Sequence, residues 1–187
     1  MILVLGLCGL RFGECAALRV RSVDLMRRRL RVSESVSEVN GYMIWSTPKT
    51  HQRFVPIRRS LIDALVAQAT GKKPEDVLFS SPNGKPIRLA DWRQRVWDSA
   101  VAAGGLSGLT PHDLRHTAAS LAIASGASVK HIQRMLGHKD AATTLNVYAS
   151  LFEDDLDDVS NRLDAALLEA SAACMRPEPS AAILELP

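Results

Sequence analysis

Strand-like and helical patterns occupy separate parts of this sequence, and that separation is the strongest constraint on its fold. Three short runs rich in β-branched and aromatic residues lie at 29–35, 42–47 and 53–58. Asn40-Gly41 is a strong hairpin signal between the first two runs. Pro56 places the third run at a sheet edge, because proline has no N–H to donate to a neighbouring strand. The pattern predicts a small three-stranded antiparallel sheet.

Helical periodicity fills most of the remaining chain. The apolar opening MILVLGLCGL and the following RFGECAALRV each predict a short helix. Further helices are expected at about 59–69, 90–103, 111–125, 128–136, 141–149 and 155–174. The predicted fold class is therefore α+β, mainly α-helical, and the proline-containing residues 175–187 are expected to form a flexible tail.

Charge is distributed unevenly along the 187 residues. The net charge is only +3, but residues 151–187 hold nine acidic and two basic side chains, a net of −7. Residues 1–150 therefore carry +10. A basic body with an acidic tail is typical of a polyanion-binding protein whose tail shields itself or docks a partner. Two solvated faces of opposite charge are the alternative.

The cysteines and the opening segment indicate a cellular compartment. Cys8, Cys15 and Cys174 are odd in number and form no C-x-x-C pair, which favours neither a disulfide framework nor a thiolate zinc site. The opening apolar run is too short to span a bilayer, and no basic segment precedes it as in a signal peptide. We expect a cytoplasmic protein with no membrane contact.

The stretch TPHDLRHTAASLAIASG, residues 110–126, concentrates proton donors at a helix start. Thr110 suits the N-cap, Pro111 the first turn, and Asp113 a capping-box-like arrangement. His112 and Arg115 share one stripe, where free N–H groups and the helix dipole favour an anion. The stretch predicts a phosphate site. A capped helix start with a surface ion pair remains the alternative.

Other polar residues are weak signals singly. Arg11 and Glu14 have i, i+3 spacing, and Lys49 lies in the loop STPKTHQR. Gly137 is expected to end a helix in the left-handed conformation and to place His138 just beyond it. Tyr148 follows ten residues later.

Taken in order, the motifs G-L-R-F-G-E, T-P-K-T, H-D-L-R-H, L-G-H and T-x-x-x-Y are specific. Together they resemble the catalytic domain of the tyrosine recombinases, the phage-integrase family, over roughly residues 1–160. The resemblance implies a tyrosine recombinase catalytic-domain fold over residues 1–174, without the separate N-terminal DNA-binding domain that members usually carry. It implies a site-specific DNA recombinase that cleaves and rejoins strands through a covalent 3′-phosphotyrosyl intermediate.

The resemblance also implies roles for the phosphate-binding residues. Tyr148 would be the nucleophile that attacks the phosphodiester. Arg11 and Arg115 would clamp the non-bridging oxygens, and His138 would donate a further hydrogen bond to them. Such a set neutralises the phosphoryl group in the transition state without a metal or another cofactor.

The remaining implied roles concern protons and support. His112 would assist proton movement at the tyrosine, and Lys49 would protonate the leaving 5′-oxygen. Glu14 would orient the arginines. His116, further round the helix, is expected to hydrogen-bond structurally.

The expected partners are double-stranded DNA, further copies of the chain in a tetrameric synapse, and accessory DNA-bending proteins. The acidic 155–174 helix suits docking on a neighbouring protomer or on its own core. Two rival functions stay open. One is a DNA-binding or regulatory module that lacks autonomous recombination. The other is a metal hydrolase built on His112, His116 and His138, which the absence of an H-E-x-x-H glutamate and the repulsion from two arginines disfavour.

Overall fold

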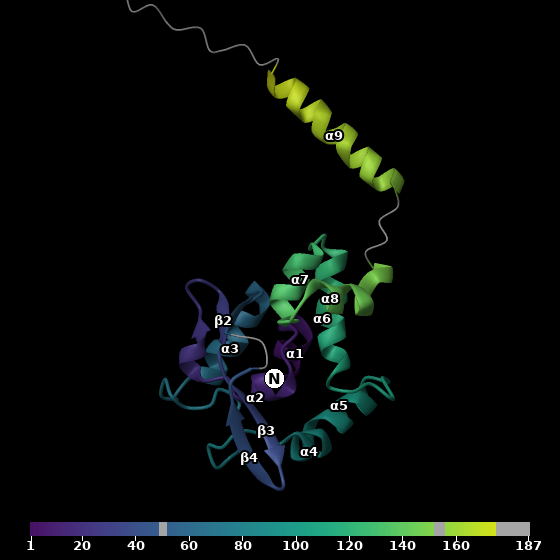
Figure 1. Ribbon diagram of the computed structural model, residues 1–187. Helices are drawn as coiled ribbons and strands as arrows, with labels where there is room; N and C mark the ends of the chain where they lie inside the picture. Colours follow the sequence, from purple (N-terminus) through teal and green to yellow (C-terminus); the bar gives the residue numbers. More distant parts are fainter. Residues whose placement is uncertain (49–51, 152–155, 175–187) are drawn as a thin grey trace, which may run out of the picture. The chain divides into compact units, whose positions relative to one another are not determined.

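The computed structural model describes residues 1–48, 52–151 and 156–174 (Figure 1). The chain divides into two compact units, Met1–Ala149 and Ser150–Pro187. The first unit combines helices with small antiparallel sheets, so the predicted α+β class is confirmed. In the second unit, helix α9 runs over Leu156–Cys174.

Two short helices begin the chain and position the first arginine. Helix α1 (Ile2–Cys8) ends at Gly9, whose left-handed backbone (φ 66°) lets its N–H bond the Leu5 carbonyl. Helix α2 (Phe12–Ala16) follows at once, with Arg11 as its extended N-cap residue. The turn between them therefore fixes where Arg11 leaves the backbone.

The strands form two sheets, not one. The three-stranded antiparallel sheet has the order β1 (Val23–Asp24), β2 (Arg29–Val32), β5 (Arg53–Pro56). Strands β3 (Ser35–Val39) and β4 (Tyr42–Ser46) form a separate hairpin. A small three-stranded antiparallel sheet is present, as predicted, and β5 lies at its edge, but its members differ: β1 was not predicted, and the 42–47 run forms β4 of the separate hairpin.

The three-stranded sheet and the hairpin separate near the end of the first predicted run, because the residues on either side of this point pack on different neighbours. Val32 ends β2 and is buried in the main core, whereas Val36 of β3 is buried against Ala16 of α2 and Ala17 just after it. The Asn40-Gly41 turn has positive φ at both residues (49° and 80°), as a tight hairpin requires, and joins β3 to β4.

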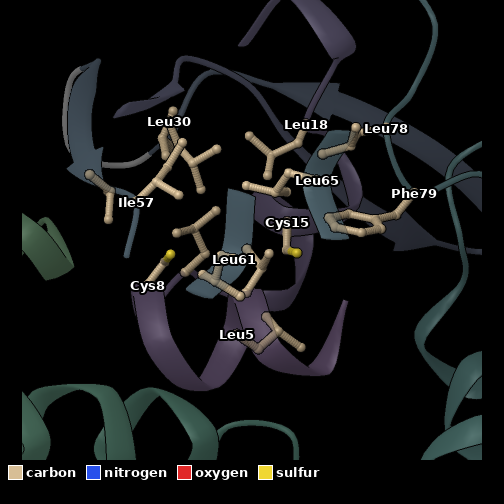
Figure 2. Close-up of a cluster of buried hydrophobic side chains, with 14 of the residues drawn as sticks. Leu5, Cys8, Cys15, Leu18, Leu30, Ile57, Leu61, Leu65, Leu78 and Phe79 are labelled. Carbon is tan, nitrogen blue, oxygen red and sulfur yellow. The ribbon is translucent and has the colours of Figure 1, made fainter. Parts of the chain in front are cut away.

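Alternation along the three-stranded sheet separates a core face from a solvent face. Leu30 and Val55 are paired partners and are fully buried, and Ile57 continues the same side beyond β5. Figure 2 shows Leu30 and Ile57 directed into the cluster that also holds Leu61 and Leu65. The intervening residues of β2 and β5, including Arg29, are exposed.

Helices supply the rest of the first unit, close to their predicted positions. They are η1 (Val20–Ser22), η2 (Arg59–Leu61), α3 (Ile62–Ala69), α4 (Leu89–Trp92), η3 (Arg93–Trp97), α5 (Asp98–Ala103), α6 (Asp113–Ala124), α7 (Val129–Leu136), α8 (Ala141–Tyr148) and η4 (Ala149–Leu151). The helix predicted at 90–103 is interrupted by the π-helical turn η3. Helix α6 packs on α1, and α7 packs on α6, α8 and β5. No helix in the described ranges is long and apolar enough to cross a membrane.

Candidate active site

A buried carboxylate, Glu14, is the centre of the candidate site. Its Oε2 accepts the backbone N–H of Arg11 at 2.9 Å, and its Oε1 accepts the Arg11 guanidinium at 3.2 Å. Burial alone would raise the pKa of this carboxyl, but hydrogen bonds and charge from Arg53 and Arg11 hold it below its usual value. Glu14 is therefore ionised and orients Arg11, as expected from the sequence.

Arg53 is a member of this cluster that the sequence analysis did not single out. Its guanidinium donates to both Glu14 oxygens at 2.9 and 2.7 Å, and its Nε donates to the Met135 carbonyl at 3.0 Å. The signal was available, because alternation in RFVPIR puts Arg53 on the same face as buried Val55. An inward-facing arginine in a strand requires a buried acidic partner, and Glu14 supplies it.

Arg115 is held by two backbone carbonyls. It lies in the first turn of α6, is 3% exposed, and donates to the Gly9 carbonyl at 2.6 Å and to the Leu136 carbonyl at 2.8 Å. These carbonyls belong to the ends of α1 and α7, where the helix dipole favours a cation. Burial and the neighbouring Arg11 lower the pKa of Arg115 to about 10, which leaves it charged at neutral pH.

His138 lies just past α7, where Gly137 adopts the predicted left-handed conformation (φ 69°). Its Nδ1 lies 2.9 Å from the hydroxyl Oγ1 of Thr144, which is fully buried in α8. Burial, reinforced by the charges of Arg115 and Arg11, lowers the pKa of His138 to about 4. The ring is therefore neutral at pH 7, in the positive field of Arg115, Arg11 and Arg53.

Tyr148 ends α8 and is 4% exposed. Its hydroxyl lies 2.9 Å from Nδ1 of His116, and the ring of His112 meets that of His116 edge-to-face at 5.1 Å. Burial raises the pKa of Tyr148, whereas the charge of Arg115 acts in the opposite direction. Among the described residues the hydrogen-bond partner of the tyrosine is thus His116, and His112 stands one ring further away.

The start of α6 differs slightly from the expected capping. The Thr110 hydroxyl and N–H both donate to the Asp113 carboxylate, at 2.8 and 2.7 Å, and the helix begins at Asp113 after a turn. These bonds lower the pKa of Asp113. They fix the turn that carries His112, which remains solvent-exposed.

The structure thus brings together Arg11 and Glu14 from the start of α2, Arg115 from α6, His138 from the loop after α7, and Tyr148 from α8. Lys49 lies outside the described residues. Within residues 1–48, 52–151 and 156–174, no group of three histidine, cysteine or acidic side chains is placed to hold a metal ion.

Comparison with known proteins agrees with this arrangement. Residues 1–154, more than three quarters of the chain, match the sequence profile of the phage integrase family. The chain belongs to the phage integrase family.

Two curated relatives are recombinases. The tyrosine recombinase XerD of Pseudomonas putida is 33% identical over 144 residues, which cover 77% of this chain and 46% of the relative. The tyrosine recombinase XerC of Alcanivorax borkumensis is 30% identical over 145 residues, covering 77% and 44%. The chain thus spans about half the length of the curated relatives it matches.

Solved structures share the fold. The Tn1549 transposon integrase in complex with circular intermediate DNA aligns with a TM-score of 0.70 and 23% identity, over 88% of this chain and 58% of that one. The XerA recombinase aligns with a TM-score of 0.62 and 24% identity, over 94% and 57%. The predicted tyrosine recombinase catalytic-domain fold is confirmed.

Proposed function

We propose that this chain is the catalytic part of a site-specific DNA recombinase that cleaves and rejoins strands through Tyr148. The observation that carries the proposal is the grouping of Arg11, Arg115 and His138 around buried Glu14, beside a helix that ends in a hydrogen-bonded tyrosine. Family membership and the recombinase relatives support it.

The arginines bind the scissile phosphate. Arg11 and Arg115 place two guanidinium groups near one point, and their side chains are fixed in advance by Glu14 and by the two helix-end carbonyls. Phosphoryl transfer depends mainly on positioning and on neutralising charge at the non-bridging oxygens. A preorganised pair of arginines supplies both effects.

His138 adds a neutral donor to this set. Because it is uncharged at pH 7, it can donate from Nε2 only if Nδ1 is the acceptor atom of the ring. We assign the Thr144 hydroxyl, 2.9 Å from Nδ1, as the donor of this bond, which leaves the ring hydrogen on Nε2. Thr144 is thus a positioning residue that acts through His138.

The nucleophile needs a proton acceptor, because burial disfavours the phenolate. Nδ1 of His116 is at hydrogen-bond distance and takes the phenolic proton as the tyrosine oxygen bonds to phosphorus. Partial burial, with the charges of His116 and Arg115, lowers the pKa of His112, so this ring is neutral at pH 7; it meets His116 edge-to-face at 5.1 Å and is the proposed next acceptor of the proton. The bond from phosphorus to the 5′-oxygen breaks, and that oxygen leaves as a hydroxyl after taking a proton, for which Lys49 is the proposed donor.

The phosphotyrosyl ester conserves the energy of the broken bond. A 5′-hydroxyl can therefore attack it in reverse and rejoin the strand without ATP. The proposed partner is double-stranded DNA, and exchange between two duplexes requires further copies of the chain, with accessory DNA-bending proteins where the site must be curved.

The decisive test is a covalent adduct with supercoiled plasmid. We expect the wild-type chain, at low salt without metal or ATP, to give relaxed DNA and a protein–DNA adduct after a detergent quench. Tyr148→Phe removes both. Tyr42→Phe is the matched control, because Tyr42 is the other tyrosine of the chain and is 74% exposed. Binding without an adduct from the wild type would instead indicate a DNA-binding module.

A further inference from the structure

The solvent face of the three-stranded sheet carries a concentration of arginine that the catalytic cluster does not use. We call it the arginine face; it comprises Arg29, Arg31, Arg58 and Arg59. All four side chains are exposed, and within the described part of the chain none of these side chains makes a hydrogen bond or an ion pair. By contrast, Arg19, Arg21 and Arg88 elsewhere on the surface each have an acidic partner.

Strand register places Arg29, Arg31 and Arg58 on one side. Leu30 and Val32 of β2 point into the core, so Arg29 and Arg31 point outward. Beyond β5, the N–H of Ile57 bonds the Arg28 carbonyl and continues the pairing by one residue, and buried Ile57 directs Arg58 outward. Arg59 follows in η2. The basic surface therefore runs along β2 and across the end of β5.

The same sheet keeps this surface apart from the catalytic cluster. Arg53 begins β5 and points inward to Glu14, whereas its neighbour Phe54 points outward and lies opposite Arg31. Phe54 is 52% exposed, an apolar ring on a basic face. The sheet thus supports the candidate active site on one side and presents guanidinium groups and an aromatic ring on the other.

The chemistry of the arginine face selects its ligand. Asp24 lies opposite Arg29, but its carboxylate accepts the Arg27 N–H at 2.8 Å and lies 3.8 Å from the Arg27 guanidinium. The face therefore keeps a large positive excess. It is built from arginine and not lysine, and the planar guanidinium fork binds phosphate oxygens in a bidentate manner. Exposed aromatic rings among basic residues suit sugar and base contacts.

We propose that the arginine face is a second DNA-contact surface, which binds the phosphodiester backbone outside the catalytic cluster. This proposal rests on the proposed function, because a strand-cleaving domain is what brings duplex DNA to the chain. Duplex DNA offers a charge for about every 1.7 Å of its axis, so an extended row of arginines can neutralise several phosphates at once.

The test measures equilibrium binding of a nonspecific DNA duplex at several salt concentrations. All proteins carry Tyr148→Phe, so that covalent attachment does not disturb the equilibrium. We expect the double variant Arg29→Gln/Arg31→Gln to bind several-fold more weakly and to reduce the slope of log K against log salt by about 1.8, since each neutralised phosphate contributes about 0.9. Thermal unfolding checks that this double variant and the control double variant described next are folded.

The matched control is Arg93→Gln/Arg95→Gln on η3. It removes the same charge from exposed positions, where Arg93 makes only a 4.0 Å contact with Asp98. We expect its DNA affinity and its slope of log K against log salt to match those of the Tyr148→Phe parent. An equal loss of DNA affinity in both double variants would show a general effect of net charge. No loss of affinity in either variant would show that DNA does not occupy the arginine face. Either outcome overturns the proposal.

A further outcome separates DNA from an acidic protein partner. If the arginine double changes self-association in sedimentation but leaves DNA binding intact, the face docks acidic protein and the proposal is overturned. The plasmid adduct test decides the proposed function separately, because it follows Tyr148 in the chain with all its arginines. If the wild-type chain forms no adduct with plasmid, the proposed function fails, but the salt dependence of duplex binding still tests the arginine face.

Discussion

At the residue scale, the site is made of side chains whose partners are fixed before DNA arrives. Glu14 accepts from Arg11 and Arg53, and Arg115 donates to two helix-end carbonyls. These side chains therefore need no reorientation when a phosphate binds. The cost of this preorganisation is a set of buried charges that tolerate little change.

The tautomer of His138 gives the first prediction. Thr144→Val keeps the shape of the side chain but removes the hydroxyl that holds Nδ1. We expect adduct formation to slow by about tenfold, less than the roughly 10²–10³-fold cost of losing a transition-state donor outright. Single-turnover adduct formation measures the rate. Thr144→Ser restores the hydroxyl and should restore the rate; an unimpaired Val variant would show that Thr144 has only a packing role.

The buried ion pair between Arg53 and Glu14 gives the second prediction. Arg53→Met leaves Glu14 without its bidentate partner and should destabilise the fold by about 3–5 kcal/mol, as breaking a buried pair does. The double variant Arg53→Met/Glu14→Gln removes the stranded charge and should recover part of that loss. Urea unfolding followed by tryptophan fluorescence compares them. Equal instability of the single and double variants would contradict a dominant ion-pair contribution.

These two cases show how far a sequence can predict a site. The motifs singled out Arg11, Glu14, Arg115, His138 and Tyr148 because they are specific when taken together in order, although each is a weak signal singly. Thr144 and Arg53 were missed. Alternation in RFVPIR could have shown that Arg53 faces inward, but no local pattern encodes its contact with α2 or the contact of Thr144 with the loop after α7. His116 was expected to form a structural bond, and only the fold reveals that its partner is the tyrosine.

At the element scale, close backbone packing sets the position of Arg11 and Glu14. A Cβ added at Gly13 of α2 would lie 2.3 Å from the Val36 carbonyl oxygen of β3. The contact joins the helix that carries Glu14 to the β3–β4 hairpin. The sequence predicted the hairpin turn, but it grouped the 42–47 run with the three-stranded sheet, since strand patterns do not specify which partner a strand finds.

Gly13→Ala tests this contact. The backbone oxygen cannot rotate away, so we expect a loss of about 1–3 kcal/mol, the usual cost of overpacking. Gly6→Ala in α1 is the control, because its added Cβ would meet Leu114 Cδ2 at an ordinary 3.5 Å. Alanine in a helix interior should be neutral or slightly stabilising there. Thermal unfolding midpoints that fall equally in both variants would argue against the α2–β3 contact.

At the scale of the whole molecule, the active-site charges couple folding to pH. His138 has a pKa of about 4 in the folded chain, below its ordinary value of 6.5. Between these pH values His138 binds a proton in the unfolded chain but not in the folded chain. The free energy of unfolding therefore falls as pH drops from about 6.5 to about 4. Glu14 acts in the same direction at lower pH, because its folded pKa also lies below its ordinary value of 4.5.

The two contributions can be separated by substitution. Trp45, Trp92 and Trp97 all lie within residues 1–149, so their fluorescence in urea follows unfolding of that unit. We expect His138→Gln to flatten the dependence of unfolding free energy on pH between about 6.5 and 4, while leaving the steeper loss below about 4.5 that Glu14 causes. Because His138 is partly exposed, the substitution should reduce the slope of unfolding free energy against pH by less than the value for one full proton. An unchanged profile in His138→Gln would mean that the arginines do not keep this ring neutral, and with it the tautomer argument for Thr144 would fail.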